Sequence, residues 1–490
     1  MNDENADNKE LLKGLRSDVE EVEKDLRLKR KEKIPVVLKR VFICAFVVVL
    51  VVFVATGTFS FIINKYAEGF KNPIVKELSE GMRSDLNVVL SHSFSLLRPL
   101  PYSVNVPTLS IKAKSVILVD ADNGFILYEK NADKIIPPAS LTKLVVMYIA
   151  MKEVEAGNIS LSDIVPLPPQ AWAINAPPGS SLMFLGEGQR VTLEELLRGM
   201  AVVSGNDAAM AVACYISGNT IDFVKRMNSE MSALGLSQSR FVEPTGYSEE
   251  NKTTAREFAA FCRVYLEKFP QTIELFHNVR EFTYPQEHNI PTNYVQKSAI
   301  AGTLPVKQEP TNRVLTELEG ADGLKTGYIN ESGYNLSLTV CRDNTRFISV
   351  ALGGFGSNTI EGNRYRLADS QQLINWAFSE FKTYKSTGNN CFPVCVFGGE
   401  MNALNLIPAK VSKDFSIPVP VSEKNVEVSI EVPKFLNAPV EVGDVLGNLV
   451  YYQGDLILER VPLIADRTIG SCGGIKKIFD NLAFERCFTE

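Results

Sequence analysis

The sequence is poor in histidine and has no excess of positive charge. Its 490 residues contain only three histidines, His92, His277 and His288, which lie far apart along the chain. Neither a histidine-rich metal site nor a Ser-His-Asp triad is indicated, and we expect no metal and no cofactor. The formal net charge of −6 argues against the basic face with which a protein binds nucleic acid.

The eight cysteines do not form the pattern of a disulfide framework. Cys44 lies in an uncharged segment, which leaves an odd number in the rest of the chain, and an odd number cannot pair completely. Most of them stand in apolar stretches, so we interpret them as buried free thiols. The spacing of Cys391 and Cys395 is only a weak indication of a redox or metal site.

Charge is also absent from one long stretch near the N-terminus, residues 41–63. As a helix this stretch spans about 34 Å, enough to cross a bilayer. Residues 27–40 before it are strongly basic, which places the N-terminus in the cytoplasm and the bulk of the chain outside. A cleaved signal peptide is the alternative. The apolar run is longer than the roughly 7–15 residues of a signal peptide, so we favour an uncleaved, single-pass anchor.

The charged tail, residues 1–40, contains a short heptad pattern. Leu12, Leu15, Val19, Val22 and Leu26 repeat at alternating spacings of three and four, a seam that could pair two tails. Two heptads are fewer than a stable coiled coil normally needs. We therefore expect a solvated, partly helical tail with at most weak dimerisation.

Beyond the anchor, periodicity and turn residues predict an α+β organisation. After a short helical stretch at their start, residues 64–108 lack a clear period and are interpreted as a stalk, whereas residues 391–474 show only strands and turns. We expect a hairpin over 116–130, around Asp122-Asn123-Gly124. Helices are predicted over 140–156, 193–200, 208–216, 223–234, 254–268 and 366–384, and further strands over 334–341 and 346–353.

A last helix is predicted over 475–490. Ile475, Ile478, Phe479 and Leu482 share one face of it, so it could lie on a membrane surface. So short a helix is equally compatible with one that docks on the preceding strands. The sequence leaves both alternatives open.

Three short motifs occur in a fixed order along the chain. They are Ser140-x-x-Lys143, Ser204-x-Asn206 and Lys325-Thr326-Gly327. Each is weak alone, because the first two patterns recur elsewhere in the sequence. Here, however, the first opens a predicted helix, the second joins two helices and the third precedes an apolar strand. That combination indicates one catalytic site.

The spacing of the first motif suits a serine nucleophile with a lysine base. Three residues are nearly one helical turn, so the hydroxyl of Ser140 and the amine of Lys143 can lie within hydrogen-bond reach. A lysine base must have a lowered pKa, and burial together with a second cation, Lys325, acts in that direction. Ser204 can relay a proton to the leaving amine, and Asn206 can hold a substrate amide.

The third motif suits the binding of an extended peptide. An edge strand after Lys325-Thr326-Gly327 could pair with the peptide's main chain. The backbone N–H groups of Tyr328 and Ser140 could then form an oxyanion hole.

These motifs resemble those of low-molecular-weight penicillin-binding proteins, the D-alanyl-D-alanine carboxypeptidase family. The resemblance covers roughly residues 109–385 and implies a serine peptidase with a β-lactamase/transpeptidase-like fold, in which an antiparallel sheet carries a helical subdomain. Residues 391–474 resemble the small all-β C-terminal domain of many members. The stretches that carry the resemblance are Pro138–Lys143, Val203–Ala208, Arg240–Gly246, Asp322–Gly327 and Ala438–Gly443.

The resemblance also implies roles for single residues. Ser140 is expected to be acylated, Lys143 to act as its base, and Ser204 with Asn206 to form the second catalytic element. Lys325 and Thr326 are expected to bind the substrate carboxylate, with Arg364 as a weaker candidate. The substrate-binding set is completed by Gly327 and Tyr328.

The implied activity is the removal of the terminal D-alanine from peptidoglycan stem peptides that end in D-Ala-D-Ala. β-Lactams are then expected as covalent inhibitors, and the enzyme is expected on the outer side of the bacterial cytoplasmic membrane. Alternatives are a D,D-endopeptidase, a β-lactamase and a non-catalytic cell-wall scaffold. No Leu-Asn dipeptide occurs between Ser140 and Lys325, which counts against a class A β-lactamase.

Two departures from the family pattern concern the substrate rather than the reaction. Thr245-Gly-Tyr247 stands where the family often has His-Gly-Leu, and Tyr328 stands where histidine is common. Because the nucleophile and base positions are intact, we expect these changes to alter substrate preference.

Overall fold

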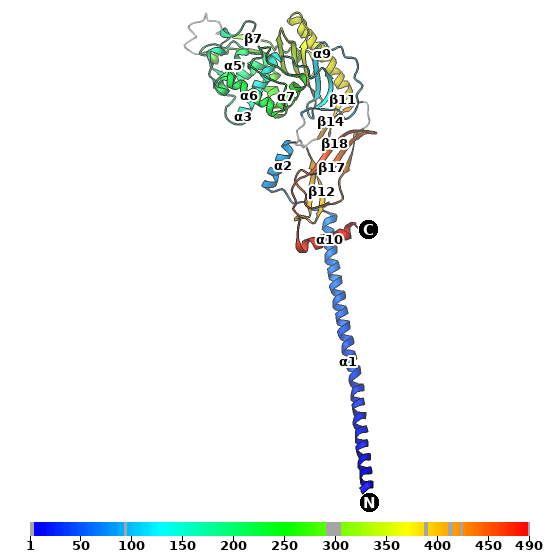
Figure 1. Ribbon diagram of the computed structural model, residues 1–490. Helices are drawn as coiled ribbons and strands as arrows, with labels where there is room; N and C mark the ends of the chain where they lie inside the picture. Colours follow the sequence, from blue (N-terminus) through cyan, green and yellow to red (C-terminus); the bar gives the residue numbers. More distant parts are fainter. Residues whose placement is uncertain are drawn as a thin grey trace.

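The computed structural model describes residues 4–92, 96–290, 305–386, 391–409, 415–421 and 425–488. The molecule is elongated (Figure 1): the long helix α1 (Glu4–Lys71) leads to a small β domain, and a larger domain lies at the far end. The predicted apolar segment lies inside α1. By length and composition, Leu38–Lys71 could cross a membrane.

The larger domain is built on a six-stranded sheet of order β1-β3-β2-β10-β9-β8. Neighbouring strands are antiparallel except β1 and β3. The predicted hairpin and the two predicted strands after Lys325 are confirmed, and β8 forms an edge of the sheet. The strands are β1 (Arg98–Pro99), β2 (Ser115–Asp120), β3 (Phe125–Lys130), β8 (Ala321–Ile329), β9 (Gly333–Arg342) and β10 (Thr345–Gly354).

Helices cover both faces of this sheet. Alternate side chains of β2 point to opposite sides: Ile117 and Val119 join the core of the helical subdomain, whereas Val116 and Leu118 join the core beneath α9. The predicted α+β, transpeptidase-like architecture is thereby confirmed. The helices are α3 (Lys143–Glu155), α4 (Leu193–Val202), α5 (Asn206–Ser217), α6 (Thr220–Ala233), α7 (Ala255–Lys268), α8 (Val314–Glu317) and α9 (Thr359–Glu380). Short strands β4 (Ile164–Val165), β5 (Val191–Thr192), β6 (Phe282–Tyr284) and β7 (Val306–Gln308) form two small ribbons.

The region after the last long helix consists of strands, as the sequence predicts. The helix predicted over 366–384 is wrong at its end, however, because residues 381–386 form β11. This strand pairs along its whole length with β14, a long-range partner that overrides the helical pattern. The strands are β11 (Phe381–Ser386), β12 (Phe392–Phe397), β13 (Ala403–Pro408), β14 (Phe415–Pro420), β15 (Glu427–Glu431), β16 (Leu436–Asn437), β17 (Val445–Gln453) and β18 (Leu456–Ala465).

The segment predicted to be a stalk, 64–108, is more structured than expected. Its first residues continue α1, and it contains α2 (Glu80–His92) and β1. Arg467 of the β domain donates a hydrogen bond of 2.7 Å to the carbonyl of Lys76. This contact joins residues that are 391 positions apart, so it has no local signature in the sequence.

The last helix, α10 (Gly474–Phe488), docks on α1 and β12. The hydroxyl of Tyr66 donates to Asp480 at 2.6 Å, and the ring of Phe479 meets Tyr66 and Phe59 edge to face. Asp480 is fully buried. Of the two alternatives for this helix, docking is the one the structure shows, although Ile475 and Ile478 of the predicted apolar face remain exposed.

The seam predicted to pair two tails is only partly visible. Val19, Val22 and Leu26 are exposed on α1. The side chains of Leu12 and Leu15 lie outside the described residues. Dimerisation through the tail stays a prediction.

Candidate active site

The first motif sits where the chain enters α3. A short 3₁₀ turn, η1 (Ala139–Thr142), carries Ser140 into the helix, and Ala139 adopts φ 52°, a left-handed conformation that is unusual without glycine. The amine Nζ of Lys143 lies 2.9 Å from Oγ of Ser140. The predicted one-turn spacing therefore brings the two groups into direct contact.

Two further oxygens hold the amine of Lys143. Its Nζ donates to Oδ1 of Asn206 at 2.7 Å and to the backbone carbonyl of Thr245 at 2.6 Å. Lys143 is completely buried, and burial lowers its pKa to about 7, although the carboxylates of Glu243 and Asp207 act in the opposite direction. A lysine in this state can act as a base near neutral pH.

The second motif forms the connection between α4 and α5. Ser204 is buried and has φ 62°, so a second residue at the site is held in the left-handed region. The next carboxylate, Asp207, accepts hydrogen bonds from the backbone N–H groups of Met183, Phe184 and Leu185. These bonds attach the 183–185 segment to the start of α5.

The sequence suggested that the third motif precedes a strand. Instead, the motif lies inside the edge strand β8. Lys325 is fully buried and donates to the carbonyl of Thr326 at 2.8 Å. Burial and the neighbouring cations Lys143 and Arg366 lower its pKa. Gly327 passes directly against the nucleophile turn, since a Cβ on it would lie 3.0 Å from the backbone nitrogen of Ser140.

The guanidinium beside this motif belongs to Arg366 and not to Arg364, the residue named from the sequence. Arg364 is exposed and pairs with Glu361 at 3.3 Å. Arg366 donates from Nη2 to the carbonyl of Gly327 at 2.5 Å. Two residues along a helix are about 200° apart, so the two arginines point to opposite sides of α9.

Tyr328 stands at the rim of the site. Its ring is 48% exposed and packs against Tyr334, with 4.4 Å between the ring centres. Its hydroxyl donates to Asn330 at 2.8 Å. An exposed aromatic ring next to Gly327 is available to contact an extended peptide.

Three further groups lie beside the motifs and were not named from the sequence. They are Arg366, the carbonyl of Thr245 and the carboxylate of Asp207. Asp207 directly follows the Ser-x-Asn motif, which is a usable signal. The other two depend on which helix face and which loop meet the motifs, and the sequence alone does not show this.

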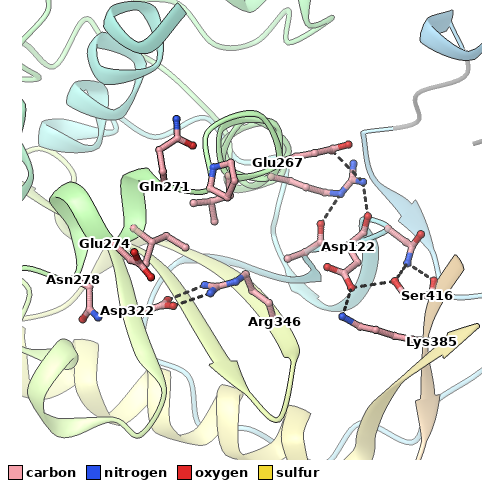
Figure 2. A pocket seen from close by; sticks show the side chains of 15 residues that line it. Asp122, Glu267, Gln271, Glu274, Asn278, Asp322, Arg346, Lys385 and Ser416 are labelled. Carbon is pink, nitrogen blue, oxygen red and sulfur yellow. Dashed lines mark hydrogen bonds and ion pairs between the residues drawn. The ribbon is translucent and has the colours of Figure 1, made fainter. Parts of the chain in front are cut away.

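A large cavity lies apart from these residues (Figure 2). Its volume is about 820 Å³, and none of the predicted site residues lines it. Arg346 and Asp322 form a bidentate ion pair there, with distances of 2.9 and 2.8 Å. Lys385 of β11 lies 3.6 Å from Asp122, which also accepts from Ser416 of β14. The cavity therefore lies where the sheet meets the end of α7, the segment that follows α7, and the β11–β14 pair.

The cysteines are free thiols, but only part of the set is buried. Cys214, Cys262 and Cys395 are buried, and burial raises the pKa of Cys262 to about 12. Cys391 is half-buried, as are Cys341, Cys472 and Cys487. The prediction of buried thiols therefore holds for three of the seven that lie outside the apolar segment.

Comparison with known proteins gives the same family for the two parts of the chain. Residues 102–356 match the D-alanyl-D-alanine carboxypeptidase family, and residues 383–471 match the C-terminal domain of penicillin-binding protein 5. The D-alanyl-D-alanine carboxypeptidase DacF of Bacillus subtilis (strain 168) is 31% identical over 372 residues, which cover 75% of this chain and 88% of the relative. DacC of Escherichia coli (strain K12) is 30% identical over 379 residues, 76% of this chain and 88% of the relative.

Solved structures of similar fold agree with these matches. Penicillin binding protein 5 from Haemophilus influenzae superposes with a TM-score of 0.64 at 29% identity, covering 75% of this chain and all of that chain. Penicillin binding protein 6B from Escherichia coli gives a TM-score of 0.58 at 26% identity, covering 74% of this chain and 98% of that chain.

Proposed function

The chain belongs to the D-alanyl-D-alanine carboxypeptidase family of serine-type peptidases, and from this membership we propose which of its residues remove the terminal D-alanine from peptidoglycan stem peptides. We propose that Ser140 is acylated and that Lys143 is its base. The observation that carries this proposal is the 2.9 Å contact between Nζ of Lys143 and Oγ of Ser140, in a buried setting that lowers the pKa of Lys143 to about 7.

We propose an acylation step in which Ser140, Lys143 and Ser204 take part. Neutral Lys143 takes the proton of the Ser140 hydroxyl while Oγ attacks the carbonyl carbon of the penultimate D-alanine. The C–N bond to the terminal D-alanine then breaks, and the proton that Lys143 took from Ser140 reaches the departing amine through the hydroxyl of Ser204. Water hydrolyses the resulting ester, which releases the shortened peptide and restores the hydroxyl.

We propose that the peptide lies along the free edge of β8. The backbone N–H groups of Ser140 and Tyr328 would bind the oxyanion. The terminal carboxylate would contact Lys325 and Thr326, with Arg366 in place of Arg364 as the nearby guanidinium. Arg366 lies beside this motif, since its Nη2 donates to the carbonyl of Gly327 at 2.5 Å.

Penicillins are proposed to acylate the same serine. The penicillin-binding names of the similar structures support this. An endopeptidase, a β-lactamase or an inert scaffold is less supported, since the similar proteins DacF and DacC are named carboxypeptidases.

The test compares two serines in the same sequence pattern. Ser140→Ala should abolish both labelling by a fluorescent penicillin and release of D-alanine from a D-Ala-D-Ala peptide. Ser379 also precedes a lysine by three residues, but it donates to the carbonyl of Trp376 within α9. Ser379→Ala should keep both activities, and retained D-alanine release in Ser140→Ala would refute the assignment.

We also propose a location for the enzyme. The apolar part of α1 would anchor it in the bacterial cytoplasmic membrane, with the tail inside and the remaining domains outside. The basic residues before the span support this orientation. The peptidoglycan substrate lies on that outer side.

A further inference from the structure

The loop 243–251 takes its shape from one carboxylate, that of Glu243. Oε2 accepts hydrogen bonds from the backbone N–H and the hydroxyl of Thr245, at 2.7 and 2.6 Å. Oε1 accepts from the N–H of Gly246 at 2.7 Å and from the side-chain amide of Asn251 at 2.9 Å. Both oxygens are surrounded by donors, which is the arrangement that an ionised carboxylate needs.

This loop touches both members of the proposed catalytic pair. The carbonyl of Thr245 accepts the 2.6 Å hydrogen bond from Lys143. Gly246 has φ +79°, and a Cβ on it would lie 1.9 Å from the carbonyl oxygen of Ala139, just before Ser140. The bonds that Glu243 makes to Thr245 and Gly246 therefore fix the two points at which the loop meets the site.

A second connection runs through Asn251, which is fully buried. Its amide nitrogen, which donates to Glu243, also lies 3.2 Å from Oγ1 of Thr142, and its oxygen accepts from the N–H of Val242 at 2.7 Å. Thr142 immediately precedes Lys143. The carboxylate is thus linked to the beginning of α3 as well as to the loop.

We propose that Glu243 is a positioning residue of the carboxypeptidase reaction: it fixes the Thr245 carbonyl and thereby aims the amine of Lys143 at Ser140. The inference rests on the roles proposed above for Ser140 and Lys143. A neutral amine has two N–H bonds and one lone pair. With Asn206 and the Thr245 carbonyl accepting the two N–H bonds, the lone pair faces the hydroxyl that it must deprotonate.

The same carboxylate also influences the charge of the base. The charged groups that face Lys143 are Glu243 on the loop, Asp207 on α5 and Lys325 on β8. The two carboxylates raise the pKa of Lys143, while burial lowers it and dominates. Removal of the Glu243 charge should therefore lower this pKa further.

The decisive variant is Glu243→Gln, which keeps the shape of the side chain and removes its charge. The rate at which fluorescent penicillin acylates Ser140 is measured from about pH 5 to about pH 9, an interval that brackets a lysine pKa near neutrality. We expect the acid-side midpoint to fall by about one pH unit. The plateau rate should fall by about tenfold or more. The side-chain NH₂ group of the glutamine cannot accept hydrogen bonds from the backbone N–H groups of the loop, so the Thr245 carbonyl is no longer fixed.

The matched control is Glu249→Gln, which removes an exposed carboxylate from the same loop. Its profile should equal that of the wild type. A midpoint that is unchanged in Glu243→Gln, while Ser140 is still labelled, overturns the proposal, because a merely structural role would lower the rate without moving the midpoint.

A second variant, Glu243→Asp, covers the case in which Glu243→Gln does not fold. It keeps the charge but is one methylene too short to reach both backbone N–H groups. The midpoint should then stay near that of the wild type while the plateau falls, and a wild-type plateau contradicts the inference. Labelling that persists in Ser140→Ala refutes the proposed function instead, so the two failures are distinguishable.

Discussion

The amine of Lys143 determines how this site responds to pH. Burial lowers its pKa to about 7, against the opposing effect of Glu243 and Asp207. Lys143 must lose its own proton before it can accept one from Ser140, so we predict that kcat/KM rises with pH through a midpoint near 7. Release of D-alanine from a soluble D-Ala-D-Ala peptide, followed as a function of pH, checks this. A value of kcat/KM that stays constant as the pH passes through 7 would exclude Lys143 as the base.

The two arginines of α9 provide a second test at the scale of single residues. Arg366 reaches the carbonyl of Gly327, whereas Arg364 is exposed. We predict that Arg366→Gln lowers kcat/KM by about tenfold or more, the effect of losing a charge-assisted hydrogen bond to the substrate carboxylate. Arg364→Gln should remain close to wild type. If Arg366→Gln affects a peptide with an amidated C-terminus equally, Arg366 does not bind the carboxylate.

At the scale of elements, the site exists because β8 passes very close to the η1 turn. Gly327 makes this approach possible, since a Cβ there would lie 2.8 Å from the carbonyl of Pro138 and 3.0 Å from the nitrogen of Ser140. We predict that Gly327→Ala lowers the acylation rate by about 100-fold, because the nucleophile and the strand are forced apart. It should also reduce the free energy of unfolding by about 1–3 kcal/mol.

The control for this change is Gly186→Ala. A Cβ at Gly186 meets only the side chain of Gln189, at 3.7 Å or more. Stopped-flow acylation and thermal unfolding of both variants separate the two effects. Wild-type acylation in Gly327→Ala would show that the close contact between β8 and η1 is not needed.

The sequence predicts the elements that carry the motifs better than the contacts between them. Apolar patterning and turn residues are sufficient to predict α3 to α7 and β9 and β10. This holds for α6, which buries one face, and for α3 and β9, which bury almost all of their residues. The same patterning failed at 381–386, where pairing with β14 decides the structure, and in the stalk, whose order comes from partners such as Arg467. Within the site, motif order identified Ser140, Lys143 and Asn206, which the structure brings together. It could not identify Arg366, because the face of α9 that meets β8 is a tertiary property.

At the scale of the whole molecule, α1 and α10 connect the apolar span to the folded domains. Arg486 of α10 donates to Asn64, and Tyr66 donates to Asp480, so the end of α1 belongs to the folded part. We predict that removal of residues 1–58 releases the protein from membranes but preserves D-alanine release within about twofold, because Tyr66 and its neighbours remain. Membrane flotation and a peptide assay check this. A truncated protein that still floats with vesicles would show that α10 or another surface suffices for attachment.

We propose that the peptidase reaction passes through an ester on Ser140, formed with Lys143 as base. The most direct measurement is mass spectrometry of the enzyme quenched during turnover of a D-Ala-D-Ala peptide, with the modified residue located by fragmentation. We predict an acyl adduct on Ser140, at a mass that corresponds to the peptide minus its terminal D-alanine. Lys143→Ala should accumulate no such adduct. An adduct on another residue, or D-alanine release from Ser140→Ala without any adduct, would contradict this proposal.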